Sequence, residues 1–245
     1  MKAEFLPLPY LSLARTARPA RKNGFTLPEL LVVVTIIAVL AAIAIPVSQN
    51  IRKSAQSATC VSNLKQVGAA IIEYAVDNNN KLPGLSPIDP ATRRRSSIWP
   101  EGVARAGYLW GTPNKGRLPC GTGVWTCPSC DFMSDAFGGY GVAENTVFQY
   151  DQLTAEGGVT GGSLRLTEID DPANTWLVGD AAQKPSTPKK GWYGIWANPA
   201  DWKNSHCPAG RHGGKSNVCM VDGHVESLTT KQIADRKLTY DVVRR

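Results

Sequence analysis

Cysteine and histidine are the residue types in this chain best suited to bind a metal ion or to undergo redox chemistry. The 245 residues include six cysteines and three histidines. Cys127-Pro-Ser-Cys130 has the C-x-x-C spacing of zinc sites and of redox-active dithiols. No second C-x-x-C accompanies it and no βαβ pattern surrounds it. In an oxidising compartment we therefore expect a structural disulfide rather than a metal or redox centre.

All six cysteines are candidates for disulfides if the domain lies outside the cytoplasm. The first of them, Cys60, falls in a helical pattern, and we expect it to pair with a cysteine in a loop and so attach the rest of the domain to the helix. The sequence leaves the connectivity open. The candidates are Cys60, Cys120, Cys127, Cys130, Cys207 and Cys219.

The three histidines all lie within residues 206–224. His212, Asp222 and His224 offer two imidazoles and a carboxylate, a set that can hold a metal ion. However, Asp222-Gly223 is a strong signal for the turn of a β-hairpin, and His212 can be held by backbone hydrogen bonds. We therefore expect structural roles for these residues and assign no metal to them.

The rest of the sequence carries little that indicates catalysis. It contains no nucleophile elbow, no phosphate-binding loop and no spacing typical of a catalytic triad. Tryptophans can stack on a carbohydrate, but Trp176, Trp192 and Trp196 lie in strand-like runs and are expected to fill a core. We therefore predict that the protein is not an enzyme and needs no cofactor.

The most distinctive segment is a run of 18 residues without a charge, Leu30 to Val47. It is long enough to cross a bilayer as a helix, and one acid, Glu29, precedes it directly. Basic flanks stay in the cytoplasm, so we expect the N-terminus inside and the residues after Val47 outside. The basic residues ahead of the run are Lys2, Arg15, Arg18, Arg21 and Lys22, against one acid, Glu4.

The segment from Arg21 to Val47 resembles the N-terminal signal of type IV prepilins and type II secretion pseudopilins. Gly24, Phe25 and Glu29, followed by the apolar run, stand in the register of that signal. The resemblance implies that a prepilin peptidase cuts after Gly24, that the new N-terminal Phe25 is N-methylated, and that Glu29 guides assembly. It also implies a single-pass protein of the inner membrane, assembled with copies of itself and other pseudopilins in a type II secretion or type IV pilus-like fibre.

The acid at the start of the apolar run supports the same interpretation on physical grounds. Placing a carboxylate in a membrane-spanning helix costs roughly 2.5–3.5 kcal/mol of free energy at mid-bilayer and less near the interface. The α-amine of Phe25, which cleavage creates, could offset that cost for Glu29 of a neighbouring subunit. The simpler alternative is a membrane anchor that tolerates an acid near its end.

An ordinary secretory signal is a further alternative, with Ala42-Ile43-Ala44 as its A-x-A cleavage site. An apolar region of such a signal is about 7–15 residues long, and this one is longer and opens with Glu29. Cleavage there would release a soluble enzyme or carbohydrate-binding protein that begins near Ile45.

The basic charge of the chain is concentrated at its N-terminus. The formal net charge is +7, of which residues 1–24 carry +4, so +3 remains with the rest. Arg93-Arg94-Arg95 is the one basic cluster of the body and lies among Pro, Ser and Thr, as expected of a solvated loop. We therefore expect no nucleic-acid partner.

Three further segments resemble a large bacterial group of pseudopilin-like proteins. They are the H-x9-DG segment from His212 to Gly223, the stretch CVSNLKQVG from Cys60 to Gly68, and Cys127-Pro128-Ser129. This resemblance assigns no chemistry to the histidine. Because major pseudopilins bind calcium in a C-terminal loop, Asp180 and Asp201 are weak candidates for calcium ligands, although no dense acidic loop is present.

One long helix is predicted from Phe25 to about Val76, with a kink at the interior Pro46. Beyond the proline, apolar residues recur every three or four positions, as in an amphipathic helix that packs on another layer. This face comprises Ile51, Ala55, Ala58, Val61, Leu64, Val67, Ala70 or Ile71, Tyr74 and Ala75, and the other side includes Arg52, Lys53, Gln56, Asn63, Lys65 and Gln66.

The predicted fold is α+β, with the long N-terminal helix packed on a small antiparallel sheet, as in pilins. A short helix is expected within residues 100–110, and a closing helix within 230–236. Strands are expected at 139–142, 175–178, 192–196, 217–221 and 224–228. The domains are a leader at 1–24, a membrane-spanning segment at 25–47, its amphipathic continuation at 48–80, and a periplasmic or extracellular domain at 81–245 with the H-x9-DG segment at 212–223.

Overall fold

A computed structural model of the chain describes residues 26–86, 88, 98–109, 123–130, 138–156, 158–160 and 162–239. The chain divides into two compact units, Met1–Val47 and Ser48–Arg245. The predicted cleavage site at Gly24 and Phe25 lies outside the described residues, as do Cys120 and the cluster Arg93-Arg94-Arg95.

Helix α1 (Leu27–Asp77) contains 51 residues and continues through Pro46. Its bounds agree with the predicted helix from Phe25 to about Val76. At its start the backbone N–H and the hydroxyl of Thr26 both donate to Oε2 of Glu29, at 2.8 and 2.7 Å, which satisfies one of the free N–H groups of the first turn. The chain leaves the helix through Asn79 and Asn80, whose positive φ angles of 54° and 60° lie in the left-handed region that asparagine tolerates.

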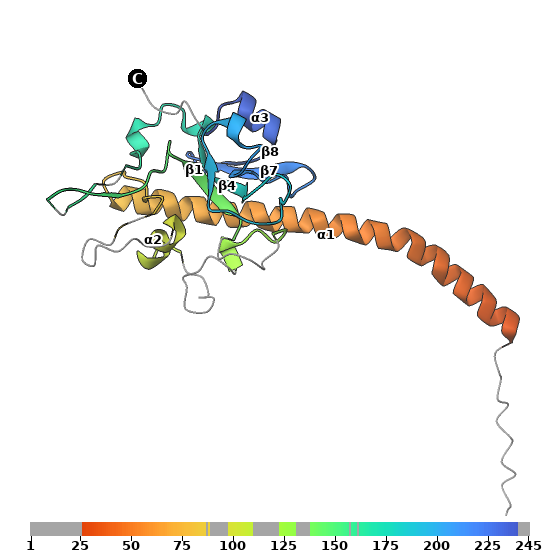
Figure 1. Cartoon of the computed structure of the whole chain (residues 1–245). Helices are drawn as coiled ribbons and strands as arrows, with labels where there is room; N and C mark the ends of the chain where they lie inside the picture. The colour runs from red at the N-terminus through yellow and green to blue at the C-terminus, as the bar shows by residue number, and fades with distance from the viewer. Residues whose placement is uncertain are drawn as a thin grey trace, which may run out of the picture. The chain divides into compact units, whose positions relative to one another are not determined.

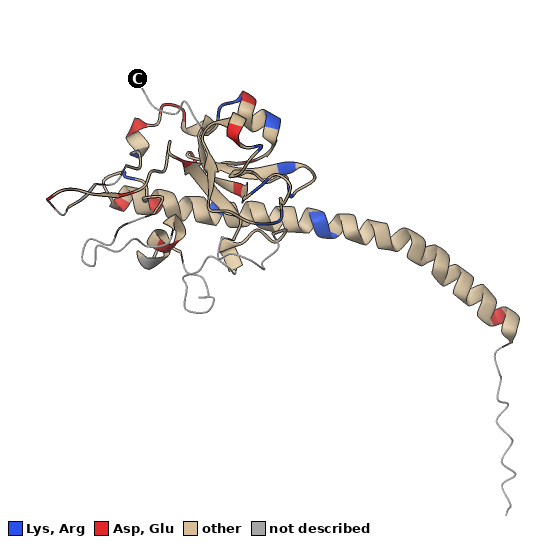
Figure 2. Cartoon of the chain, in the orientation of Figure 1, with Lys and Arg blue, Asp and Glu red and all other residues tan. Residues whose placement is uncertain are grey.

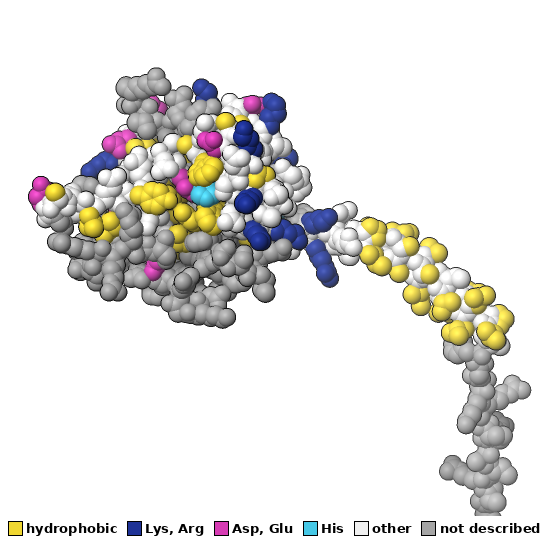
Figure 3. Space-filling model, viewed as in Figure 1, with side chains coloured by type: hydrophobic (Ala, Val, Ile, Leu, Met, Phe, Trp, Pro, Cys, Tyr) yellow, Lys and Arg dark blue, Asp and Glu magenta, His cyan; other side chains and the backbone are white. Residues whose placement is uncertain are grey.

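Within the first unit, α1 exposes its entire apolar surface. Each large apolar side chain from Leu27 to Val47 is exposed, between 44% for Val33 and 84% for Leu27. Figure 3 shows apolar side chains along the visible face of this part of the helix, and Figure 2 shows a single acidic position near its start. By length and composition, this is a helix that can cross a membrane.

The second unit contains a sheet with the strand order β5-β1-β4-β7-β8, and β6 also pairs with β4 (Figure 1). Its pairs are antiparallel except for β1 and β5, which run parallel, so the predicted antiparallel sheet is in fact mixed. The strands are β1 (Tyr140–Glu144), β4 (Trp176–Ala182), β5 (Gly194–Trp196), β6 (Cys207–Pro208), β7 (Lys215–Met220) and β8 (Val225–Thr229).

Short elements complete this unit. The short strands β2 (Gln152–Leu153) and β3 (Val159–Thr160) form a separate ribbon, and the helices are α2 (Trp99–Arg105), α3 (Thr230–Asp235), η1 (Gly123–Trp125), η2 (Leu166–Glu168), η3 (Pro172–Asn174) and η4 (Pro199–Asp201). The two-residue strands β2, β3 and β6 were not predicted, because two residues are too few for a periodic signal. Helix α3 begins with a capping box between Thr229 and Gln232.

The hairpin of β7 and β8 forms where the sequence predicts it. Cys219 pairs with Val225, and Asp222-Gly223 occupies the turn between them. Gly223 has a φ of 90°, which is accessible to glycine and strained for other residues. This turn fixes the register of the hairpin.

The C-terminal part of α1 packs on the sheet, but its buried face begins later than predicted. Ile51, Ala55 and Ala58 are exposed, whereas burial starts at Cys60. Asn63, expected on the polar side, is also buried and donates from Nδ2 to the carbonyl of Thr126 at 3.1 Å. The face that the sheet covers comprises Cys60, Asn63, Leu64, Val67, Gly68, Ala70, Ile71 and Ala75.

Candidate functional site

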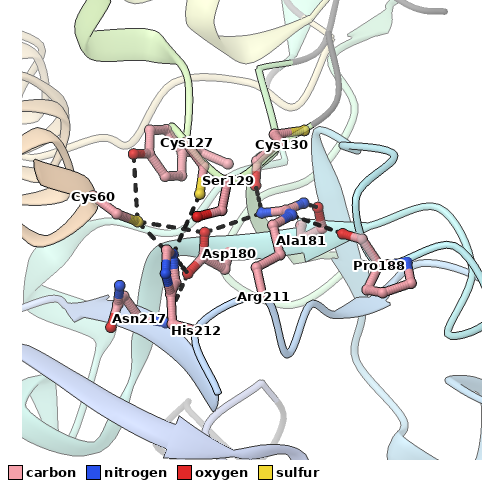
Figure 4. A network of polar contacts seen from close by, with 12 residues as sticks. Cys60, Cys127, Ser129, Cys130, Asp180, Ala181, Pro188, Arg211, His212 and Asn217 are labelled. Carbon is pink, nitrogen blue, oxygen red and sulfur yellow. Dashed lines mark hydrogen bonds and ion pairs between the residues drawn. The ribbon is translucent and has the colours of Figure 1, made fainter. Parts of the chain in front are cut away.

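Four side chains from separate parts of the second unit converge at one buried point (Figure 4). Cys60 comes from α1, Cys127 from the loop after η1, Asp180 from β4, and His212 from the turn that precedes β7. One ligand atom from each residue lies within 4.8 Å of those of the other three. We refer to these four residues as the convergent cluster.

Short contacts connect the members of the convergent cluster. Sγ of Cys127 lies 3.3 Å from Nε2 of His212, and the same nitrogen lies 3.4 Å from Oδ2 of Asp180. Sγ of Cys60 lies 3.5 Å from Oδ1 and 3.6 Å from Oδ2 of Asp180. Each of the four side chains therefore contacts at least one other member of the cluster through its potential metal-ligand atoms.

Asp180 is positioned by the middle of the sheet, because β4 lies between β1 and β7. Its side chain is fully buried, and Oδ2 accepts a hydrogen bond from the backbone N–H of Asn217 at 2.8 Å. A carboxylate in such a position must be compensated by hydrogen bonds or by an opposite charge.

Arg211 supplies that opposite charge and is itself fully buried. Its Nη1 lies 3.0 Å from Oδ1 of Asp180 and also donates to the carbonyl of Gly139 at 3.0 Å. Its Nε donates to the carbonyl of Pro188 at 2.7 Å, and Nη2 donates to the carbonyl of Ala181. The guanidinium is thus held on several sides, as the planar fork of arginine allows.

The charges of the cluster shift its proton affinities. Burial alone would raise the pKa of Asp180, but the hydrogen bond to His212 and the charge of Arg211 hold that pKa below its ordinary value. Burial opposes protonation of His212, yet its hydrogen bonds to Asp180 and Cys127 raise its pKa to about 9. The pKa of Cys127 is raised, first by its contact with Cys60 and then by burial.

Tyr140 of β1 provides an outer contact to the cluster, because its hydroxyl donates to Sγ of Cys60 at 3.5 Å. A cavity of about 580 Å³ adjoins the cluster on the side of His212 and Arg211. Basic and polar residues line this cavity, among them Lys53, Gln56, Ser129, Lys189, Arg211 and His212. The cluster is therefore buried but lies next to an opening.

The other candidates of the H-x9-DG segment lie apart from His212, on the hairpin. Nδ1 of His224 lies 2.6 Å from Oδ1 of Asp222, and its Nε2 lies 2.9 Å from Oε1 of Glu226. Glu226 also pairs with Arg236 at 2.6 Å. Both ring nitrogens of His224 are thus engaged by carboxylates in an exposed network, so His212, Asp222 and His224 do not form a common metal site.

The described cysteines are all free thiols, contrary to the predicted disulfides. The C-x-x-C pair is separated by its contacts, since Cys127 faces His212 whereas Sγ of Cys130 donates to the carbonyl of Lys189 at 3.0 Å. Cys207 and Cys219 are buried thiols outside the convergent cluster. Cys60 does meet a loop cysteine, Cys127, but in a group that also includes Asp180 and His212.

The calcium candidates do not come together either. Asp180 is buried beside Arg211, whereas Asp201 ends η4 and is exposed. Among the described residues, the group of ligand atoms around Asp180 does not include Asp201.

The tryptophans divide between the core and an aromatic group. Trp176 is fully buried and donates from Nε1 to the carbonyl of Gly141 at 2.9 Å. Trp192 and Trp196 are half-buried and both contact His206, with ring centroids at 4.9 and 4.7 Å from the imidazole. Contacts with this third histidine therefore occupy part of the surface of both indoles.

The sequence pointed to three members of the cluster but not to their association. The segments with the C-terminal resemblance begin at Cys60, Cys127 and His212, and the structure brings these first residues together. The sequence indicates Asp180 only as a calcium candidate and carries no signal for Arg211. No local motif contains them, because Asp180 lies 120 residues after Cys60 in the chain.

Comparison with known proteins found a match in the N-terminal segment. A family model described as the prokaryotic N-terminal methylation motif matches residues 19–45. Searches of curated proteins and of solved structures found no match. The motif supports a protein of the type IV pilin-like or pseudopilin class, a structural class that is generally not enzymatic. Together with the apolar surface of α1, it supports anchoring in a membrane through the N-terminal helix.

Proposed function

We propose that this protein is a non-catalytic pilin-like or pseudopilin subunit that assembles into a type II secretion or type IV pilus-like fibre. In this proposal a prepilin peptidase cuts after Gly24, Phe25 becomes the methylated N-terminus, and the globular unit lies outside the inner membrane. The observation that carries the proposal is the match of the methylation motif to residues 19–45.

The surface of α1 supports the assembly part of the proposal. The helix from Leu27 to Val47 exposes its apolar side chains around the whole circumference, as expected of a segment that is surrounded first by lipid and then by other helices. Helices of neighbouring subunits could pack on this surface when the protein leaves the bilayer for the fibre.

Glu29 gives that packing a defined register. Its carboxylate is exposed and, among the described residues, accepts its hydrogen bonds from Thr26 in the same turn. In a fibre, the ammonium group of Phe25 from an adjacent subunit could lie beside the carboxylate of Glu29 and supply the opposite charge. At 4 Å and an effective dielectric constant of 20, the attraction is about 4 kcal/mol before desolvation is subtracted.

Replacement of Glu29 tests the proposal. Glu29→Leu should insert in the membrane and be cleaved normally, because the change makes the span more apolar, but the variant should be absent or strongly depleted in fibres. The protein would be expressed with its assembly machinery, and fibres sheared from cells would be quantified against the membrane fraction.

Glu73→Leu is the matched control, since it removes an exposed acid from the same helix within the second unit. It should leave fibre levels unchanged. Wild-type amounts of Glu29→Leu in sheared fibres would mean that Glu29 is a tolerated residue of a simple anchor and that the assembly proposal is wrong.

A further inference from the structure

We propose that the convergent cluster of Cys60, Cys127, Asp180 and His212 is a structural zinc site. This inference concerns the second unit alone and does not depend on assembly into a fibre. Thiolate, imidazole and carboxylate are the three ligand types that zinc takes in proteins, and four protein ligands are typical of a structural site.

The distances within the cluster match the edges of a zinc tetrahedron. With Zn–S bonds of about 2.3 Å and Zn–N or Zn–O bonds of about 2.0–2.2 Å, the ligand atoms of a tetrahedral site lie roughly 3.3–3.8 Å apart. With Oδ2 as the ligand atom of Asp180, the contacts from Cys127 to His212, from His212 to Asp180 and from Cys60 to Asp180 measure 3.3, 3.4 and 3.6 Å. Three of the six edges thus already have the length that tetrahedral zinc requires, and all four ligand atoms lie within 4.8 Å of one another.

The charges also balance around a divalent cation. Two thiolates and one carboxylate carry three negative charges, which Zn²⁺ and the buried Arg211 together neutralise, and His212 gives up its proton to bind as the neutral imidazole. Buried charge is tolerated when it is paired in this way. The arginine beside Asp180 thus completes a neutral group.

The outer contacts are those that hold ligands in place. Asp180 is oriented through Oδ1 by Arg211 and through Oδ2 by the backbone N–H of Asn217. The hydroxyl of Tyr140 donates to the sulfur of Cys60. Hydrogen bonds of this kind fix the ligands of metal sites. The cavity that His212 lines adjoins the proposed site.

A disulfide between Cys60 and Cys127 is the competing chemistry for the same sulfurs. It would use two of the four convergent groups and leave His212 and Asp180 as a hydrogen-bonded pair beside it. Zinc uses all four, and it joins α1, the loop after η1, the strand β4 and the turn before β7 at one point. Its function in this proposal is to hold the globular unit on the helix.

Metal analysis of the full-length protein tests the proposal. The chain would carry a tag without histidines, be extracted from membranes in detergent without chelator or reductant, and be analysed by inductively coupled plasma mass spectrometry. We expect about one zinc ion per chain. Cys60→Ser, Cys127→Ser and His212→Gln should each lower the zinc content at least about tenfold.

Matched controls are available in the same domain. Cys207→Ser and Cys219→Ser remove buried thiols outside the cluster and should retain zinc. Cys130→Ser removes the other half of the C-x-x-C pair and should also retain it. His224→Gln removes a histidine that carboxylates already engage and should have no effect on metal content.

Cobalt substitution provides a measurement that does not depend on how a variant folds. Wild-type protein stripped with a chelator and reloaded with Co²⁺ should show the visible bands of a tetrahedral ion and a thiolate-to-metal charge-transfer band, and added Zn²⁺ should abolish both. Wild-type protein that contains neither zinc nor a cobalt site would overturn the proposal. So would a cross-linked Cys60–Cys127 peptide in a non-reducing digest, or zinc that is lost from Cys130→Ser but kept in His212→Gln.

Discussion

At the scale of single residues, Arg211 and Asp180 form a fully buried ion pair in the second unit. Neither side chain is exposed to solvent. Asp180 lies on strand β4, and Arg211 lies in the segment between β6 and β7. Breaking such a pair by removing one partner is far more costly than replacing both, because the remaining charge stays buried without compensation.

We therefore expect Arg211→Met to lower the free energy of unfolding by about 3–5 kcal/mol. Urea unfolding of the detergent-solubilised protein, followed by tryptophan fluorescence, would measure this, since all seven tryptophans lie after Ser48. Lys231→Met is the control, because it breaks an ion pair with Asp235 whose side chains are 83% and 60% exposed, and it should not shift the urea midpoint measurably. An Arg211→Met curve that overlays the wild type would show that Asp180 does not depend on this cation.

At the scale of elements, the close approach of α1 to the sheet depends on the absence of a side chain. Gly68 is buried in the helix, and a Cβ there would lie 2.5 Å from Sγ of Cys219 on β7. Glycine is unfavourable inside a helix by about 1 kcal/mol relative to alanine, so contact with the sheet is what favours it at this position.

Gly68→Ala should accordingly destabilise the domain by about 1–3 kcal/mol although alanine is the better helix former. The same urea measurement applies, with Gln66→Ala on the exposed side of the helix as a control that should change little. Combining Gly68→Ala with Cys219→Ala removes the sulfur and should cost less than the sum of the single changes. Strict additivity would mean that the helix does not meet β7 at this point.

At the scale of the whole molecule, charge and hydropathy divide the chain into segments with different environments. Residues 1–24 carry a net charge of +4, and the part of the helix from Leu27 to Val47 exposes apolar side chains. Figure 2 shows basic and acidic positions interspersed along the second unit. Processing after Gly24 would remove the basic segment and expose a new amine at Phe25 next to the apolar surface.

We expect the mature protein in membranes to begin at N-methylated Phe25, as measured by intact-mass and N-terminal peptide mass spectrometry. Gly24→Asp should leave the full-length precursor in the membrane, whereas Asn23→Asp adds the same charge one residue earlier and should still be processed. Processed Gly24→Asp protein in unchanged amount would remove Gly24 from the cleavage site. A soluble product that begins near Ile45 would instead support the secreted enzyme or carbohydrate-binding alternative.

Local patterns in the sequence determined the longer elements of this protein and the processing signal that its N-terminal segment resembles. The uncharged run after Glu29 predicts the long helix, Asp222-Gly223 predicts the hairpin, and both are present because their causes act between residues close in the chain. Five strands and the closing helix were predicted at nearly their observed positions for the same reason. The methylation motif is likewise a local feature of residues 19–45.

Only the tertiary structure decided how these elements meet. The parallel pairing of β1 with β5, the start of the buried helix face at Cys60, and the meeting of Cys60 with Asp180 across 120 residues depend on which strands become neighbours. A periodic pattern shows which face of an element is apolar, but not which part of that face a partner covers. The convergent cluster could therefore not be derived from spacing, because its four residues belong to four segments that only the folded sheet and helix bring together.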